Sequence, residues 1–266
     1  MKKGIKSHMQ LPKLILKNFR GEADPEKKVW YMDLNTGEIR RSSPARLGTE
    51  IGYYSQEGEE FWNRCVETSL GKLVKKTKAF CDGEMDALII DQDDAEAAKL
   101  YIKSAFIRSR ATYEAVLRNS YTAFMLTDKQ QHDIISYIGM NVEGPMDEYI
   151  NNLVVTVLVN KTELDLVVPR NCYYCISSWG LMHFVAPISP RCALMLLPAE
   201  IIKNREGALV TLDNIEDADE MNIMALKFEY MCNRDFIAAG KKDELEWLQN
   251  YRKENLEKLI TVREFI

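Results

Sequence analysis

His8 has a side chain that could take part in acid–base chemistry, because imidazole gains and loses a proton near neutral pH. It lies just before the segment 11–19, in which Pro12 restricts the backbone and several large apolar side chains predict burial. Next to a buried segment, a histidine could act as an acid or a base. Two other interpretations stay open: an ordinary surface histidine, and the remnant of a cleaved tag, because Ser7-His8-Met9 is what such a tag leaves.

The cysteine spacing offers a possible metal site in the second half of the chain. Cys172-x-x-Cys175, followed by His183 and Cys192, supplies four side chains of the kinds that bind zinc. The residues around the first two cysteines favour a strand, in which positions three apart face opposite sides, so these two could share a metal only across a turn. Six cysteines in 266 residues do not resemble a secreted disulfide framework. We therefore favour buried, reduced thiols and expect no metal and no cofactor.

Arg108 and Arg110 fall inside a predicted helix, between apolar positions. One of them could point inward to meet a carboxylate, since buried charges are usually paired. The alternative is that both reach the surface through their aliphatic stems. We take Arg108 as a candidate catalytic residue and Arg110 as a candidate binding residue.

Acidic residues gather at two places. Six of them lie between Asp82 and Asp94, but their spacing lacks the alternation and the closing glutamate of a calcium loop, so a solvated loop and helix start explain them better. Glu163 and Asp165, at a predicted hairpin, could belong to a nuclease that uses carboxylates and a lysine, although short charged residues are common at hairpins. The sequence contains no Gly-rich phosphate loop, no dinucleotide-binding pattern and no G-x-S-x-G motif.

Composition narrows the class of protein. Hydrophobic residues make up 46% and charged residues 28% of the chain, as in ordinary soluble globular proteins. The formal net charge of -5 disfavours broad contact with a nucleic-acid backbone, although a local basic patch is compatible with it. No apolar run reaches membrane-spanning length and the charged N-terminus lacks a signal-peptide pattern, so we expect a cytoplasmic protein with no membrane contact.

The elements that must position these residues change in type along the chain. The first half shows one hairpin and three helices, predicted at 28–34 with 39–41, 59–78, 93–125 and 128–139. The second half shows another hairpin, four strands and two helices, predicted at 153–159 with 164–168, 173–177, 182–186, 193–197, 208–212, 224–236 and 245–259. This order predicts an α+β fold, with an N-terminal hairpin, central helices, a C-terminal mostly antiparallel sheet and closing helices, in one domain over residues 1–266.

Several short motifs, taken together, are similar to those of a known family. They are Pro12-x3-Leu16-x2-Phe19, the hairpin at Trp30-Tyr31, Tyr53-Tyr54-Ser55, Glu67, Arg108-Ser109, Pro187-Ile188-Ser189-Pro190 and the helix start at 222–225. Over nearly its full length the chain thus resembles the microbial domain-of-unknown-function family 4238, whose members open with His, Pro, Leu and Phe. The gap between His8 and Pro12 is one residue longer here than in that family.

One stretch departs from the family's pattern. Its members commonly carry Ser-Asp-Asn-Pro where this chain has Pro169-Arg170-Asn171-Cys172. If the family's aspartate is catalytic, an arginine in its place removes metal binding and general-base chemistry from that position. Arg170 and Asn171 are therefore taken as candidate binding residues.

Two functions are compatible with these observations. In the first, a binding or regulatory protein, His8, Glu67 and Arg108 form a buried ionic network while the surface recognises a protein partner or a second copy of the chain. In the second, the same residues are catalytic in a hydrolase acting on a phosphodiester or a nucleotide: His8 is the acid or base, Glu67 orients it and Arg108 holds a phosphate. A role in microbial conflict or phage defence is implied only by analogy. The departure at Arg170 slightly favours the binding function.

Overall fold

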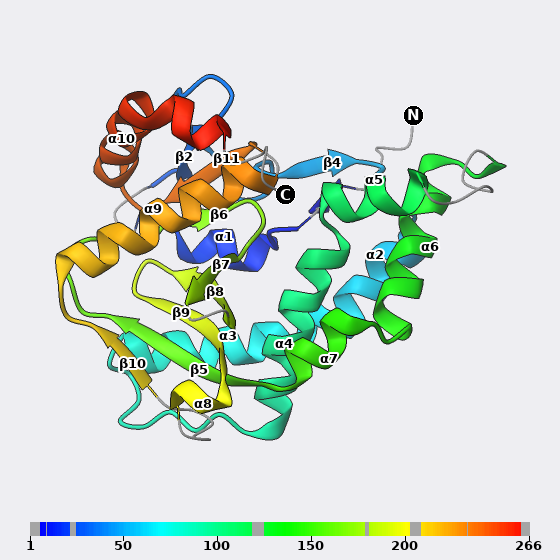
Figure 1. Cartoon of the computed structure of the whole chain (residues 1–266), viewed down its shortest axis with the longest axis horizontal. Coiled ribbons are helices and arrows are strands. Elements are labelled where there is room, and N and C mark those ends of the chain that lie inside the picture. The colour runs from blue at the N-terminus through cyan, green and yellow to red at the C-terminus, as the bar shows by residue number, and fades with distance from the viewer. Residues whose placement is uncertain are drawn as a thin grey trace.

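The protein has an α+β fold, as predicted, with helices packed around separate sheets (Figure 1). A computed structural model describes residues 6–8, 10–21, 25–118, 125–178, 181–202, 209–232 and 234–261. The strands are β1 Lys6–His8, β2 Val29–Asp33, β3 Ile39–Ser42, β4 Thr49–Ile51, β5 Leu153–Asn160, β6 Val168–Pro169, β7 Tyr174–Ser178, β8 Leu181–Ser189, β9 Cys192–Pro198, β10 Leu209–Leu212 and β11 Phe236–Ala239. The helices are α1 Lys13–Asn18, α2 Gln56–Trp62, the π-helix η1 Asn63–Glu67, α3 Thr68–Cys81, α4 Gln92–Ile107, α5 Arg110–Arg118, α6 Asp128–Asn141, α7 Pro145–Asn151, α8 Ala199–Ile202, α9 Ile215–Cys232 and α10 Lys242–Thr261.

A five-stranded sheet of order β10-β5-β9-β8-β7 forms the centre of the molecule. It is antiparallel except where β10 runs parallel to β5, which confirms the predicted mostly antiparallel sheet. Alternate residues of β9 face opposite sides: Leu194 and Leu196 belong to one apolar cluster, and Ala193 and Met195 to the other. Because all seven residues of β9 are buried, the strand is apolar throughout, as expected for a sheet covered on both faces.

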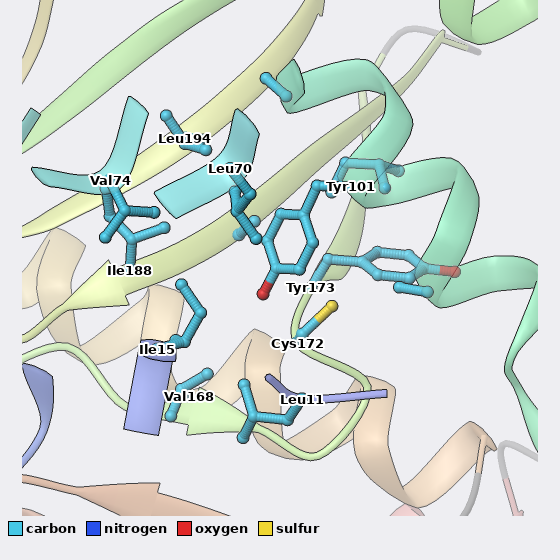
Figure 2. Packing of buried hydrophobic residues seen from close by; sticks show 14 of the residues in the cluster. Leu11, Ile15, Leu70, Val74, Tyr101, Val168, Cys172, Tyr173, Ile188 and Leu194 are labelled. Atoms are coloured by element: carbon cyan, nitrogen blue, oxygen red, sulfur yellow. The ribbon is translucent and has the colours of Figure 1, made fainter. Parts of the chain in front are cut away.

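The first apolar cluster lies between this sheet and the helices α1, α3 and α4. Figure 2 shows Leu70 and Val74 of α3 in the same cluster as Ile188 of β8 and Leu194 of β9. Ile15, from the N-terminal segment, is fully buried there. The predicted burial is confirmed for Leu11, Ile15, Leu16 and Phe19, whereas Leu14 is half-buried, and the segment anchors the start of the chain to the central sheet.

A second sheet, of order β3-β2-β11-β6, is antiparallel throughout. Its β2–β3 pair is the predicted N-terminal hairpin, and Gly37 in the connecting turn has a φ of +77°, which favours glycine. Helices α9 and α10 pack against each other, and α10 also packs on β2 and β11 (Figure 1). Phe236 lies in β11, so the prediction that it continues a helical stripe is wrong: the helix ends at Cys232, and Arg234 has a φ of +53°.

The predicted second hairpin is also wrong. The first of its strands, β5, pairs with β9 and β10, whereas Val168 belongs to β6, which pairs with β11 in the other sheet. The side chain of Asn160 redirects the chain at the end of β5, because its Nδ2 donates to the carbonyl of Leu164 at 2.6 Å and its Oδ1 accepts from Thr162. Residues 161–167 therefore form a connection between the two sheets.

The helix predicted over 93–125 is two helices in the structure. The N-cap is Asp91, whose side chain accepts from the amide of Asp94, so the helix begins one residue earlier than predicted, at Gln92. Helix α4 ends at Ile107 and α5 begins at Arg110, so Arg108 occupies the C-cap between them. The helix predicted over 59–78 is present, but it contains the π-helical turn η1, and α6 continues past Gly139 to Asn141.

Within the described residues, no helix combines the length and the apolar character needed to cross a membrane.

Candidate functional site

Arg108 is buried, with only 4% of its surface exposed. Its guanidinium carbon lies 4.9 Å from the ring centre of Trp62 and 5.5 Å from that of Tyr54. One of the two arginines thus points inward, but no described carboxylate lies within 4 Å of it, so aromatic rings replace the expected ion pair. We call Arg108, Tyr54, Trp62 and the neighbouring Glu59 the Arg108 centre.

Glu59 connects this centre to the N-terminal strand. Burial raises the pKa of its carboxyl, and the Ser7 hydroxyl of β1 and the Arg108 charge oppose the rise. The Ser7 hydroxyl oxygen is also 3.4 Å from the amide nitrogen of Tyr54. Glu67, half-buried in η1, acts electrostatically on Glu59 without forming an ion pair with Arg108 in the described part of the chain. Strand β1, Glu67 and Arg108 are therefore grouped around one carboxylate.

The predicted catalytic set of His8, Glu67 and Arg108 stays a prediction. The backbone of His8 pairs with Thr49 in β4, but its side chain lies outside the described residues. The side chain of Arg110, the candidate binding residue at the start of α5, lies outside them as well.

His132 is a histidine near the Arg108 centre that the sequence did not single out. Its ring stacks between Tyr53 and Tyr113, with ring centres 3.6 and 4.1 Å away, and its Nδ1 is 3.1 Å from the carbonyl oxygen of Tyr53. Burial lowers its pKa, so this imidazole is held neutral and joins α5, α6 and the segment before α2.

Arg170 and Asn171, the other candidate binding residues, lie in a buried polar network. Arg170 forms an ion pair with Asp235, and its Nη2 is 3.9 Å from Glu50. Asn171 accepts a hydrogen bond from Gln10 at 2.8 Å and donates to Glu229 at 3.0 Å. Glu229 is fully buried, and burial raises its pKa to about 8. The arginine that departs from the family pattern thus balances carboxylates of this chain.

The four possible zinc ligands do not come together. Cys172, which has a φ of +61°, lies beside the hydroxyl of Tyr101 in the first apolar cluster (Figure 2). Cys175 is opposite Phe184 in the β7–β8 pair, whereas Cys192 contacts Ser189. In the part of the chain that the structure describes, no three His, Cys, Asp or Glu side chains form a group able to hold a metal.

A polar cleft of about 480 Å³ opens on another part of the molecule. Five segments that are distant in sequence form its walls: the end of α1, the end of α3, the connection after β5, the β8–β9 turn and the loop before α10. Its charged side chains are Arg20, Lys78, Asp82, Asp165, Arg191 and Lys241. We call it the Asp165 cleft.

Asp165 is the buried centre of this cleft, with 4% of its surface exposed. Its Oδ1 is 3.2 Å from Arg191 Nη2 and its Oδ2 is 3.1 Å from Lys241 Nζ. The backbone that follows it is fixed by Asn222, which donates to the carbonyl of Asp165 and accepts from the amide of Val167. Both cations are thus held at a fixed place on the cleft wall.

Glu244 lies next to Asp165, at the start of α10. Its Oε1 accepts from the amide of Asp165 at 3.4 Å and is 3.7 Å from Lys241 Nζ. The residue is 5% exposed, and its Oε2 has no hydrogen-bond partner among the described residues. Burial, reinforced by the charge of Asp165, raises the pKa of Glu244.

Sequence reasoning weighed Asp165 only as part of a hairpin and missed the cleft. Two signals were present: Ser189 and Pro190, from the motif 187–190, line the cleft, and Asn222, from the motif at 222–225, holds Asp165. No signal connected them to Arg191 and Lys241, because the five segments meet only in the folded chain.

A second, apolar groove lies between α5 and α6, on the side of the molecule away from α10 (Figure 1). Its volume is about 330 Å³, and Val116, Leu117, Ile134, Ile135 and Ile138 line it. Ile138 is 52% exposed, which is high for an isoleucine. This groove is a surface that a protein partner or a second copy could cover, and the partner itself stays a prediction.

Comparison with known proteins assigns the chain to one protein family. A family model described as "Protein of unknown function (DUF4238)" matches residues 10–243, a range that contains both the Arg108 centre and the Asp165 cleft. No curated protein and no solved structure gives a significant match.

Proposed function

The chain belongs to the DUF4238 family, and we propose that it is a binding protein whose ligand is a small phosphorylated molecule held in the Asp165 cleft. The observation that carries this proposal is the arrangement of Arg191 and Lys241 on the two oxygens of a buried carboxylate. A buried aspartate between two cations holds them in position before a ligand arrives, which lowers the entropic cost of binding.

The charge of the cleft favours an anion. Four cationic and two carboxylate side chains line it, which gives a formal local charge of +2 in a chain whose net charge is -5. Arginine and lysine are the side chains that most often bind phosphate groups. The long helix α10 begins at Lys242, directly after the cleft residues Gly240 and Lys241, and the N-terminus of a helix attracts negative charge.

The size of the cleft favours a small molecule. Its volume lies within the range of about 300–1,000 Å³ that is common for small-molecule sites. A mononucleotide or a sugar phosphate has the matching chemistry: a phosphate for the cations and hydroxyl groups for Asp82, which stays 30% exposed in its ion pair with Lys78.

Titration calorimetry with inorganic phosphate, pyrophosphate and mononucleotides tests this proposal. We expect at least one of these anions to bind, and Lys241→Ala to weaken binding roughly 10- to 100-fold, the effect of losing one hydrogen bond to a charged group. Lys241 suits the test because its side chain is 53% exposed and Arg191 still balances Asp165 in its absence.

The matched control is Lys253→Ala, which removes the same charge from an exposed position of α10. It should bind as the unchanged protein does. Absence of binding for every phosphate compound, or equal weakening in both variants, would contradict the proposal.

Hydrolysis of the bound phosphodiester or nucleotide is the second candidate function. Asp165 and Glu244 form an adjacent buried pair, and Lys241 Nζ approaches both. Because Glu244 retains its proton to higher pH than an ordinary glutamate, the pair could supply an acid next to a carboxylate that binds cations.

Phosphate release from nucleotides and from a chromogenic phosphodiester measures this activity. If the cleft is catalytic, Glu244→Gln should reduce the rate roughly 10²-fold or more while leaving binding in place. Binding without any release in the unchanged protein would reject hydrolysis and leave the binding function standing.

A further inference from the structure

Two buried carboxylates share one ammonium group at the wall of the Asp165 cleft. Lys241 Nζ is 3.1 Å from Asp165 Oδ2 and 3.7 Å from Glu244 Oε1. Asp165 has a second cation, because its Oδ1 is 3.2 Å from Arg191 Nη2. Among the described residues, Lys241 is the only cation that forms an ion pair with Glu244. The charge that balances Glu244 is therefore the same charge that is proposed to bind the anion.

The carboxyl group of Glu244 has one oxygen that suits a proton. Its Oε1 is engaged, because it accepts from the amide of Asp165 at 3.4 Å. Its Oε2 is buried, without a hydrogen-bond partner in the part of the chain that the structure describes. A buried charged oxygen loses its hydration without replacement, which is costly, whereas a protonated oxygen carries no charge. The geometry thus favours the acid form of Glu244 whenever Lys241 is drawn toward a ligand.

The charged groups that face Glu244 come from three parts of the fold. Asp165, in the connection after β5, disfavours the ionised form of Glu244, whereas Lys241, in the loop before α10, favours it. The backbone amides of Glu244 and Asp165 also favour the ionised form. Arg191, at the β8–β9 turn, reaches the other oxygen of Asp165, and α9 contributes Asn222, which does not titrate. The charge state of Glu244 therefore depends on where Lys241 is engaged.

We propose that binding of an anion in the Asp165 cleft is coupled to the uptake of one proton by Glu244. This proposal rests on the binding function proposed above. An anion on Lys241 brings a further negative charge close to Glu244 and competes with it for the ammonium group. Two ionised carboxylates and the ligand would then share the two cations, and protonation of Glu244 removes one of these negative charges. The proton comes from the solvent and forms an O–H bond at Oε2.

The coupling makes binding depend on pH with a defined sign. Below the pKa of Glu244 in the free protein, which burial and Asp165 raise above its ordinary value, the residue is already protonated and binding needs no further proton. Above that pKa, each binding event takes one proton from the solvent, so the affinity falls as the pH rises. A charge at such a distance shifts a pKa by about one unit or more, which corresponds to a roughly tenfold or larger fall in affinity.

Calorimetry with inorganic phosphate and pyrophosphate between pH 5 and pH 8 tests the coupling, in pairs of buffers with different ionisation enthalpies. These anions titrate in the same range, so the unchanged chain is compared with Glu244→Gln, and the protons of the ligand cancel in the difference. Glutamine keeps an oxygen for the amide of Asp165 and carries no charge. We expect the unchanged chain to take up more protons than the variant, by up to one, and its affinity to fall roughly tenfold further over this range.

Glu246→Gln is the matched control, because it removes the same charge from an exposed position of α10, where Glu246 pairs with Lys242. It should keep the proton uptake of the unchanged chain. Equal proton uptake in the unchanged chain and in Glu244→Gln, or the same loss in Glu246→Gln, would overturn the coupling and leave the binding function standing. Absence of binding for both anions at every pH would instead contradict the binding function and the coupling together.

A second measurement uses the unchanged chain, in case Glu244→Gln does not fold. The carboxyl carbon of Glu244 in a ¹³C-labelled sample reports its protonation directly, and its apparent pKa should rise by about one unit or more when phosphate is added. An apparent pKa that stays the same with phosphate bound would also overturn the coupling.

Discussion

Replacing Arg108 with alanine is expected to lower the free energy of unfolding by about 3 kcal/mol or more. The guanidinium lies over the rings of Tyr54 and Trp62 at a buried position, where cation–π contacts contribute about 2 kcal/mol or more, and truncation also leaves a cavity. For a protein of this size, the loss should reduce the melting temperature by roughly 6–12 °C. The melting temperature of Arg108→Lys should lie between those of Arg108→Ala and the unchanged chain, because lysine keeps the charge but loses the planar group that stacks.

Arg118→Ala is the control, because the side chain of that arginine is 78% exposed and its ion pair with Glu114 lies within its own helix. Its melting temperature should stay within about one degree of the unchanged chain. If Arg108→Ala melts like the unchanged protein and yet loses phosphate binding or hydrolysis, the structural role is wrong, and the catalytic set of His8, Glu67 and Arg108 becomes the better explanation.

Glu229→Gln is expected to remove a large pH dependence of stability. Glu229 is fully buried, and its pKa rises from 4.5 to about 8 because burial disfavours the charged form more than Asn171 and Arg170 favour it. Below pH 4.5 the carboxyl is protonated in both states. Between pH 4.5 and 8 only the unfolded chain releases this proton, so stability falls as the pH rises, by up to about 5 kcal/mol at pH 8 and above.

Denaturant unfolding at intervals between pH 5 and pH 9 measures this effect. The difference in unfolding free energy between the unchanged chain and Glu229→Gln should fall from pH 5 to about pH 8 and then level off, because Glu229 titrates and glutamine does not. Glu246→Gln, at an exposed site of α10 that pairs with Lys242, should give a constant difference. A constant difference for Glu229→Gln too would show that the buried carboxylate is ionised throughout.

Local sequence patterns predicted those elements whose structure is determined by residues close to one another in the sequence. The β2–β3 hairpin follows from strand formers on both sides of a turn that needs a positive φ at Gly37. The strands of the central sheet follow from apolar runs long enough to be buried on both faces. The predicted fold class agrees with the structure, and the family resemblance agrees with the match to the family model.

The errors arose where distant contacts decide the local structure. Phe236 continues the apolar spacing of α9, and only the left-handed backbone at Arg234 and pairing with β2 turn it into a strand residue. Val168 has the composition of a hairpin strand, but its partner is Ala238 of β11. Neither partner is near in sequence, so periodicity alone could not find it.

The candidate site was harder to predict for the same reason. Arg20, Lys78, Asp165, Arg191 and Lys241 come from five segments, and each is unremarkable in its own sequence neighbourhood. Their chemistry becomes visible only when the sheets place them around one cleft. Arg108, by contrast, was singled out from its apolar neighbours, and its burial agrees with that expectation.

The position of β11 has a consequence for how the chain matures on the ribosome. This strand lies between β2 and β6, so the second sheet cannot be joined across these two strands until residue 239 has been made. At about 5–20 residues per second, β2 waits roughly 10–40 s after its synthesis for that partner. During this interval β2 of the β2–β3 hairpin has one unpaired edge, and an unpaired strand edge is a template for pairing with another chain.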